Sequence, residues 1–274
     1  MIFSKFLQSG AALASLAAVV TAHMEMIQPP PRHSKYNPTF TGIPDYNMVD
    51  PLGIYPCKGY EQGKVVQTVE AGKEIQVKLG GVATHSGGHC QFAVSYDEGK
   101  TFAVLKTVYD DCLIGSLDYS VPIPKSAGTS KNVVFAWAWI NKVGNREYYM
   151  NCADIEIKGS DEGYISGPKL LVANLPGYPT IPEFPNQGQY DGMDLLDARP
   201  TITIRPEVTS PTSSVSPTST PNPGICDGVL AWSPDTAYSE SAKVIYGDHL
   251  WQAKWWTQGQ APGSTDAWAD LGAC

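Results

Sequence analysis

Long apolar runs, an excess of positive charge and paired metal-binding cysteines are missing from most of this sequence. Beyond the first 22 residues, no apolar stretch is long enough to span a bilayer. The 27 acidic residues outnumber the 19 basic ones, and the net charge of −8 argues against binding to nucleic acid or anionic membranes. None of the six cysteines forms a Cys-x-x-Cys pair, which disfavours a structural zinc site. We therefore expect a soluble monomer with neither a nucleic acid nor a membrane as partner.

The first 22 residues have the pattern of a secretory signal peptide. A single charge, Lys5, precedes an apolar stretch at 11–20, and small residues at Val20 and Ala22 mark a cleavage site. The alternative is an N-terminal membrane anchor, which is disfavoured because the stretch is too short to span a bilayer. Cleavage after Ala22 would release a secreted, extracellular protein that begins at His23.

A change of composition divides the rest of the chain. Residues 206–224 hold little but Ser, Thr and Pro, and such a stretch cannot bury a core. It is typical of an extended spacer. The sequence therefore predicts a larger domain at 23–205, a linker at 206–224 and a small domain at 225–274.

The larger domain has the pattern of an all-β protein. Short alternating or apolar runs rich in Val, Ile and aromatic residues are separated by Gly, Pro and Asn; they are 65–69, 74–79, 90–95, 133–140 and 153–157. Trp137 and Trp139 alternate with alanine, so one face of their strand should lie in the core. Residues 97–100 predict a hairpin turn, and 159–200 predict only a covering over the surface. The architecture that fits is an immunoglobulin-like β-sandwich.

A histidine at the mature N-terminus would be a metal chelate in itself. Its α-amine and its imidazole are two nitrogen donors within reach of one ion. A third nitrogen from another histidine would complete a planar, T-shaped set, which suits the tetragonal preference of Cu(II). An N-terminal histidine alone is weak evidence, because a secreted protein can begin with one by chance.

Two internal motifs strengthen this interpretation. One is Ala83-Thr-His-Ser-Gly-Gly-His-Cys-Gln91, and the other is Asn141-Lys-Val-Gly-Asn-Arg-Glu-Tyr-Tyr-Met-Asn-Cys152. Together with His23-Met24, they resemble the lytic polysaccharide monooxygenases of auxiliary-activity family eleven. The resemblance covers residues 23 to about 160, and more weakly the segment to about 205.

The resemblance implies roles for five residues around one copper ion. His23 and His85, the histidine that opens the His-x-Gly-Gly-x-Cys stretch, would be the metal ligands. Tyr149, which stands just before Met-Asn-Cys, would occupy the axial side of the copper. Ala83 would lie beside the open axial face, and Glu147 would lie near the site.

Some of these positions have structural alternatives. An isolated Tyr149 would be taken as a core tyrosine with a satisfied hydroxyl, and its neighbour Tyr148 would face the other side of a strand. Arg146 and Glu147 could be a surface ion pair that contributes little to stability. The choice of Tyr149 over Tyr148 therefore rests on the motif.

One residue departs from the family's motif. The family usually has a small residue before the cysteine, where this chain has His89. His89 could replace His85 as the ligand, could be an exposed extra, or could bind substrate. We favour His85 as the ligand, because its position fits the motif and its spacing from Ala83. His33 and His249 are expected to be surface residues rather than ligands.

Six cysteines in a secreted chain predict three disulfides. One pair closes the small domain, and the four cysteines of the larger domain allow three pairings. We favour a local link that would steady the loop of His85, and a second link that would anchor the strand after Tyr149 to an early loop. The predicted pairs are Cys226–Cys274, Cys90–Cys112 and Cys57–Cys152.

The small domain has a resemblance of its own. Its motifs Ala231-Trp-Ser-Pro-Asp-Thr-Ala-Tyr238, Val244-Ile-Tyr-Gly-Asp-His-Leu-Trp251 and Ala253-Lys-Trp-Trp-Thr-Gln-Gly-Gln-Ala-Pro-Gly263 look like the chitin-binding modules of carbohydrate-binding families five and twelve. The resemblance implies a small, disulfide-stapled, β-rich module. Its exposed aromatic rings would bind the flat apolar face of a β-linked sugar.

The candidate sugar-binding residues of this module are Trp232, Tyr238, Trp255 and Trp256. The alternative is that these rings fill the core of a domain of about fifty residues. Adjacent residues of an extended chain face opposite sides, so we expect one of Trp255 and Trp256 to be buried.

The two resemblances together imply copper-dependent oxidative cleavage of chitin. The implied reaction hydroxylates C1 or C4 beside the glycosidic bond, with O2 or H2O2 and electrons from an external donor. One alternative is a non-catalytic copper-binding or chitin-adhesion protein. A glycoside hydrolase is a second alternative, but it needs two carboxylates about 5 to 10 Å apart, and no acidic residue stands in a recognisable catalytic motif.

Overall fold

The computed structural model describes residues 23–206, 226, 229–234, 236–239 and 241–274. The predicted signal peptide at 1–22 and nearly all of the predicted linker at 206–224 lie outside the described residues. The chain divides into two units, residues 1–209 and 210–274, and each is described by itself. No helix among the described residues is long and apolar enough to cross a membrane.

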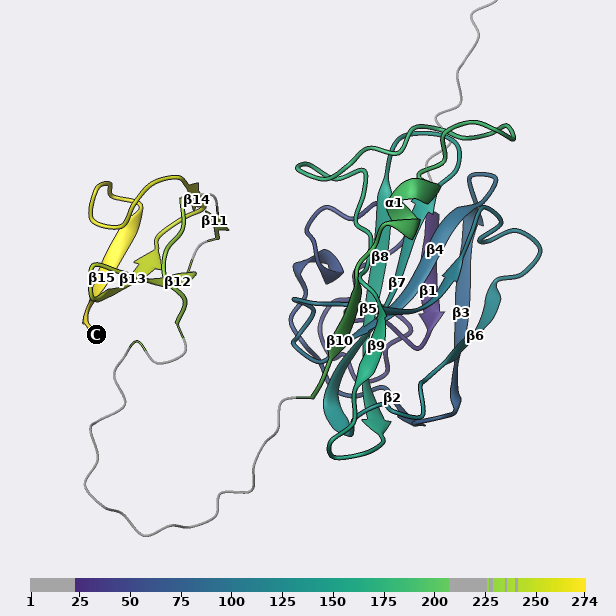
Figure 1. Ribbon diagram of the computed structural model, residues 1–274, viewed down its shortest axis with the longest axis horizontal. Coiled ribbons are helices and arrows are strands. Elements are labelled where there is room, and N and C mark those ends of the chain that lie inside the picture. Colours follow the sequence, from purple (N-terminus) through teal and green to yellow (C-terminus); the bar gives the residue numbers. More distant parts are fainter. Residues whose placement is uncertain (1–22, 207–225, 227–228, 235, 240) are drawn as a thin grey trace, which may run out of the picture. The chain divides into compact units, whose positions relative to one another are not determined.

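The first unit is a β-sandwich (Figure 1). One sheet has the strand order β2-β8-β7-β4-β5, and the other has the order β1-β3-β6. Neighbouring strands are antiparallel except β2 and β8. The strands are β1 (His23–Gln28), β2 (Gln67–Glu70), β3 (Glu74–Ala83), β4 (Gly88–Ser95), β5 (Ala103–Val108), β6 (Asp118–Pro122), β7 (Ser130–Asn141) and β8 (Tyr148–Lys158). All five predicted strand runs lie within or overlap these elements.

The five-stranded sheet is buried on both faces, which explains why its strands are so apolar. On β7, Trp137 and Trp139 are fully buried in a core shared with residues of the three-stranded sheet, as the alternation predicted. Ala136 and Ala138 face the other way, into a second core. Residues of the segment 170–184 close that second core over the outer face of the sheet.

The predicted covering segment at 159–200 does lie over the sandwich, but it also contains regular structure. Strand β9 (Ile165–Pro168) pairs with β10 (Thr201–Ile204), and a short helix, α1 (Met193–Asp197), stands between them. These strands escaped prediction because they have only four residues each and β9 contains both Gly and Pro. A 3₁₀ turn, η1 (Cys57–Gly59), lies in the long connection after β1.

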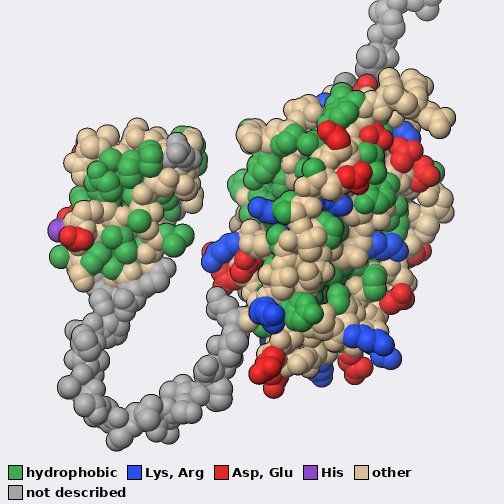
Figure 2. Space-filling model, in the orientation of Figure 1, with side chains coloured by type: hydrophobic (Ala, Val, Ile, Leu, Met, Phe, Trp, Pro, Cys, Tyr) green, Lys and Arg blue, Asp and Glu red, His purple; other side chains and the backbone are tan. Residues whose placement is uncertain are grey.

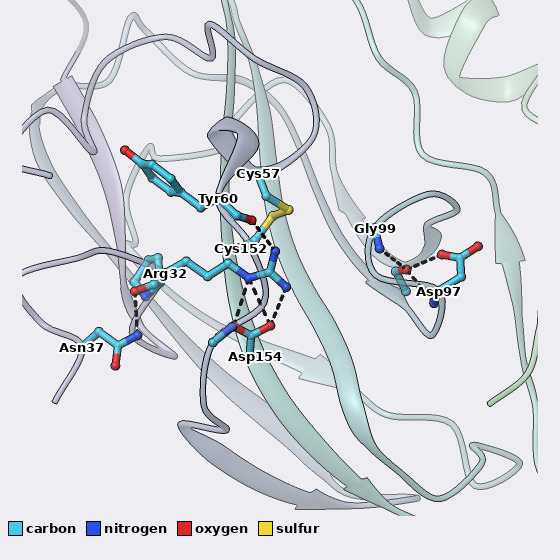
Figure 3. Close-up of polar contacts among 11 residues, drawn as sticks. Arg32, Asn37, Cys57, Tyr60, Asp97, Gly99, Cys152 and Asp154 are labelled. Carbon is cyan, nitrogen blue, oxygen red and sulfur yellow. Dashed lines mark hydrogen bonds and ion pairs between the residues drawn. A yellow bond between two sulfur atoms is a disulfide. The ribbon is translucent and has the colours of Figure 1, made fainter. Parts of the chain in front are cut away.

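Buried polar contacts tie that long connection to β8 (Figure 3). The Arg32 guanidinium donates to both carboxylate oxygens of Asp154, with the shortest contact at 2.5 Å, and to the carbonyl of Tyr60. The disulfide Cys57–Cys152 lies beside this pair. If the connection moved away from β8, the buried charges of Arg32 and Asp154 would lose their partners, which is energetically costly. The ion pair therefore fixes the connection against β8.

The predicted hairpin turn joins β4 to β5. The Ser95 hydroxyl accepts from the Gly99 N–H at 2.9 Å (Figure 3). The Asp97 carboxylate accepts from the Thr101 N–H at 2.8 Å. These contacts satisfy backbone donors that the tight turn removes from the β ladder.

The second unit is small and β-rich. It contains β11 (Ala237–Tyr238), β12 (Lys243–Tyr246), β13 (His249–Ala253), β14 (Thr257–Gln258) and β15 (Trp268–Ala273). Strands β12, β13 and β15 form one sheet, and β11 pairs with β14. Its core cluster consists of Val244, Ala253, Ala267 and Trp268. The disulfide Cys226–Cys274 closes the unit, and Figure 2 shows hydrophobic side chains over much of its visible face.

Candidate metal centre

The pairing of β1 with β3 brings two of the predicted site residues together. His23 is the register partner of Ala83 at the ends of the two strands. The register shifts between His23 and Met24, which is a β-bulge at this end of the ladder. The backbone nitrogen of His23, which would become the α-amine after cleavage, therefore lies at the strand end from which the His85 loop departs. The side chain of His23 lies outside what the structure describes.

The loop that carries His85 has an unusual backbone. His85 and Ser86 have φ of 48° and 57°, in the left-handed region that residues other than glycine rarely adopt. Gly87 and Gly88 follow with φ of 104° and 129°. Strained backbone of this kind persists where the surroundings enforce it and is concentrated at functional sites. The disulfide Cys90–Cys112 and a hydrogen bond from the Cys112 N–H to the Gly88 carbonyl hold the loop from behind, as the predicted pairing required.

The two ring nitrogens of His85 have different surroundings. Nδ1 contacts the carbonyl oxygen of Val143, which can only accept, so Nδ1 carries the proton and donates. Nε2 is buried and has no hydrogen-bond partner among the residues that the structure describes. In a neutral imidazole that tautomer leaves the Nε2 lone pair free. A ligating histidine typically donates its other ring N–H to a carbonyl or carboxylate in this way, so His85 fits a metal ion such as copper.

The loop at 141–147 orients the His85 ring. The Asn141 side-chain amide donates to the carbonyls of Val143 and Asn145, at 3.0 and 2.7 Å, and so fixes the oxygen that His85 contacts. A Cβ on Gly144 would stand 2.6 Å from Nδ1 of His85. Gly144 has φ of 100°, so this position requires glycine both for its conformation and for the close approach of the ring.

Tyr149 lies behind the His85 loop rather than on the surface. Its side chain is 1% exposed, and its ring lies 4.7 Å from that of Trp139, which in turn lies 5.8 Å from the ring of His85. The Tyr149 hydroxyl donates to Glu147 at 2.5 Å. Burial, reinforced by this hydrogen bond and the charge of Glu147, raises the pKa of Tyr149 well above its ordinary value, so the phenol stays protonated. Tyr148 faces the other core, as the alternation predicted.

The alternative of an Arg146–Glu147 surface ion pair does not describe the contacts. Arg146 donates to the carbonyls of Gly144 and Asn141, at 2.7 and 3.1 Å, so it supports the loop that holds His85. Glu147 accepts from Tyr149 instead.

His89 has no nitrogen left for a metal. Its Nδ1 accepts the Asp110 N–H at 3.1 Å, and its Nε2 donates to the Asp191 carbonyl at 2.9 Å. The residue is 1% exposed, which rules out the alternative of an exposed extra. Burial lowers the pKa of His89, in keeping with a neutral ring.

The two remaining histidines have contacts of their own. His33 was expected at the surface, but it is half-buried, stacked between Phe40 and Tyr60 at 4.3 and 4.0 Å. Aromatic rings in the connection after β1 provide that stack, and the local sequence pattern did not reveal it. His249 lies partly exposed on the second unit beside Asp270.

Sequence reasoning missed Asn151, which links the two sheets beneath the site. Its side-chain oxygen accepts from the Met26 N–H of β1 at 2.7 Å, and its amide donates to the Met48 carbonyl at 3.2 Å. The side chain is 2% exposed. Asn151 therefore fixes β1, and with it His23, relative to β8. Its position within the Tyr-Met-Asn-Cys stretch was the available signal.

No group of three or more His, Cys, Asp or Glu side chains in the described part of the chain gathers as a metal site. The predicted ligand set would not produce such a group, because it consists of two histidines and a main-chain amine. Within the described residues, the one unpartnered donor of this set is Nε2 of His85, two residues after the Ala83 that pairs with His23.

Comparisons with known proteins identify the family of the chain. An AA11 family lytic polysaccharide monooxygenase A of Aspergillus fumigatus is 39% identical over 191 residues, which are 64% of this chain and 83% of that protein. This chain belongs to the AA11 family of lytic polysaccharide monooxygenases. An AA11 member of Aspergillus oryzae is 30% identical over 187 residues, 61% of this chain and 42% of that protein. Membership of the AA11 family makes the protein an oxidoreductase that acts on polysaccharide.

The second unit of this AA11 protein matches a different family. The model of carbohydrate-binding module family 5/12 matches residues 231–269. Chitinase A of Pseudoalteromonas piscicida is 43% identical over 37 residues, which are 14% of this chain and 4% of that protein.

The expectation that one of the adjacent tryptophans is buried was wrong. Trp255 and Trp256 are 50% and 64% exposed. They lie in a bend between β13 and β14 rather than in a strand, so the alternation of faces does not apply. Trp232 and Tyr238 are half-buried against the small core, with the Tyr238 ring 5.3 Å from that of Trp268.

Proposed function

We propose that this AA11 protein is a secreted copper enzyme that cleaves chitin oxidatively, by hydroxylation at C1 or C4 with O2 or H2O2 and an external electron donor. The observation that carries the proposal is the unpartnered Nε2 of His85 beside the strand end where His23 pairs with Ala83. A cleaved N-terminus at His23 would add an amine and an imidazole to that nitrogen.

The proposed site assigns distinct tasks to the chain's own groups. The α-amine and imidazole of His23 and Nε2 of His85 would hold the metal in a planar set. Copper bound there would supply the one-electron chemistry that activates the oxidant. Tyr149, kept protonated by burial and Glu147, would lie near the metal. Ala83, with its small side chain, would leave the opposite face open to substrate.

Support for chitin comes from the second unit. The match to a carbohydrate-binding module, the likeness to a segment of a chitinase and the exposed Trp255 and Trp256 all favour a β-linked polysaccharide. The segment 206–224 would be a tether that raises the concentration of substrate around the metal site. Deletion of 206–274 should therefore reduce activity most at dilute chitin.

The decisive experiment is mass spectrometry of the products from chitin, with copper and a reductant. We expect oligosaccharides that lack two hydrogens relative to unoxidised ones, as a lactone or a keto sugar, or that carry one additional oxygen after hydration. Unoxidised oligosaccharides would identify a hydrolase, and intact chitin would identify a binding protein. His85→Ala should abolish both oxidised products and tight Cu(II) binding, while the control His249→Ala should retain both.

The amine ligand can be tested without turnover. A protein with one extra residue before His23 should lose tight Cu(II) binding, because its α-amine is displaced from the imidazole. Unchanged affinity in that protein would contradict the proposed site.

A further inference from the structure

His89 contacts three segments that lie far apart along the chain. Its Nδ1 accepts from the backbone of Asp110, its Nε2 donates to the backbone of Asp191, and its ring stacks on Phe184 at 4.9 Å with an interplanar angle of 10°. His89 itself is on the buried strand β4. One side chain therefore sets the relative positions of the segments around 110, 184 and 191.

Those same segments line a polar groove of about 330 Å³. Asp110 and Lys142 form one part of it, joined by an ion pair of 2.7 Å. Phe184 and the amide side chains of Asn186, Gln187 and Gln189 form the other part. The Lys142 ammonium lies over the Phe184 ring, 5.9 Å from its centroid, and so connects the two.

The groove is directly attached to the loop that carries His85. The Lys142 N–H donates to the Gly87 carbonyl at 3.0 Å, and the Gly88 N–H donates to the Asp110 carbonyl at 2.6 Å. The groove residue Lys142 also precedes Val143, whose carbonyl orients the His85 ring. A ligand in the groove would therefore lie next to the candidate metal centre.

We propose that this groove is a subsite for one or two units of the polysaccharide chain, and that His89 is the positioning residue that holds its walls together. Side-chain amides can donate to and accept from sugar hydroxyls and acetamido groups. The buried Phe184 ring, stacked on His89, packs beneath this segment of the chain. The choice of an N-acetylated sugar rests on the proposed function. Of the three alternatives for His89, substrate binding is thus retained in a modified form. The groove residues would contact the sugar, and His89 would only hold them in position.

The test uses the metal-free, full-length protein labelled with nitrogen-15. The side-chain amide signals of Asn186, Gln187 and Gln189 report on the groove, and the indole signals of Trp255 and Trp256 report on the second unit. Soluble N-acetylglucosamine hexamer is titrated in, with cellohexaose as the matched oligosaccharide. We expect the amide signals of the groove to change chemical shift as the N-acetylglucosamine hexamer is added. Their binding curve should saturate independently of the curve of the indole signals.

Variants separate occupancy from positioning. Asn186→Ala with Gln187→Ala alters only exposed side chains and should weaken groove binding about tenfold through lost hydrogen bonds. His89→Ala should weaken it at least as much and leave the Cu(II) spectrum unchanged. His89→Gln should restore part of the affinity, because its amide can still donate to Asp191.

Each outcome bears on one proposal. Indole shifts without groove shifts would overturn the subsite and leave chitin as the proposed substrate. Groove shifts with cellohexaose alone would overturn chitin and support the subsite. Equal groove affinity in His89→Gln, His89→Ala and the unsubstituted protein would overturn the positioning role. If His89→Ala does not fold, the comparison of His89→Gln with the unsubstituted protein decides that role, with lower affinity expected.

Discussion

The two units of this protein treat their aromatic residues in opposite ways. In the first unit, Trp137 and Trp139 are fully buried between two sheets. In the second, Trp255 and Trp256 are half or more exposed, on a bend that no other element covers enough to bury them. Both regions are rich in tryptophan, so composition alone does not separate the two arrangements.

The difference follows from size. A unit of almost two hundred residues has enough chain to enclose large rings on both faces of a sheet, whereas one of about fifty residues buries a much smaller fraction of its surface. The second unit therefore has a core of only a few residues and a disulfide that closes it. Its exposed rings, Trp255 and Trp256, are accessible, whereas Trp137 and Trp139 of the first unit are enclosed by the core.

The largest expected effect comes from opening the first core. Trp139→Ala should lower the free energy of unfolding of the first unit by about 3–5 kcal/mol, because it leaves a cavity. It should also weaken Cu(II) binding, since Trp139 packs between His85 and Tyr149. Calorimetry and copper titration measure the two effects. Trp256→Ala is the control, and an equal loss of stability from that substitution would contradict the comparison.

Opening the disulfide of the second unit should have the next largest effect. Cys226→Ser with Cys274→Ser frees a loop with a sequence separation of 48, which corresponds to about 4 kcal/mol by loop-closure entropy. Since the unit has little core, we expect it to unfold and lose chitin binding. The calorimetric transition of the first unit and its copper affinity should not change. A second unit that stays folded would show that its core is stronger than its few buried residues indicate.

Removal of the exposed rings should change binding and leave stability almost intact. Trp255→Ala and Trp256→Ala should each alter the free energy of unfolding by less than about 0.5 kcal/mol, because neither ring fills the core. Each should weaken binding to insoluble chitin several-fold, measured by depletion at low solids. The matched control is Leu230→Ala, an exposed apolar residue of the same unit. Retained chitin binding in both variants would show that the exposed rings are not the anchor.

The smallest expected effect is the dependence of the first unit's stability on pH through His89. Burial lowers the pKa of His89 in the folded protein, so the unfolded chain takes up a proton at higher pH than the folded one. The contribution of neutral His89 to the stability of the first unit should thus be fully present above the ordinary histidine pKa of about 6.5. It should decrease as the pH falls below that value. Asp110, Asp191 and Lys142 face this ring and modify the shift.

Chemical denaturation at pH 7 and pH 5 tests this expectation. In His89→Gln the difference between the two pH values should be smaller than in the unsubstituted protein. His249→Gln changes a partly exposed histidine of the second unit and serves as the control, because it should leave the unfolding transition of the first unit unchanged at both pH values. An unchanged difference in His89→Gln would mean that His89 is not neutral in the folded protein at low pH.

Four strands of the five-stranded sheet, β2, β4, β7 and β8, followed from local pattern, but β5 was missed. The three disulfide pairs are confirmed; those of the larger domain were chosen because a local link would steady the His85 loop and leave Cys57 to pair with Cys152. Strands such as 90–95 and 133–140 were recognisable because a sheet buried on both faces needs continuous apolar residues. Strand β1 was missed, although its buried Met24 and Met26 alternate with Glu25 and Ile27, because it follows directly on the predicted cleavage site. The exposure of Trp255 and Trp256 was missed because alternation was applied to a bend.

The sequence by itself determined the candidate ligands, because a histidine after a cleavage site and a histidine in a glycine-rich motif are local features. Only the tertiary structure distinguishes the ring nitrogens of His85 from those of His89. The partner of the His85 ring lies 58 residues away along the chain, and that of His89 Nε2 lies 102 residues away. Which ring nitrogen stays free depends on those distant carbonyls. Likewise, the neighbour of His23 depends on the register of β1 against β3, which is set by the core that both strands cover.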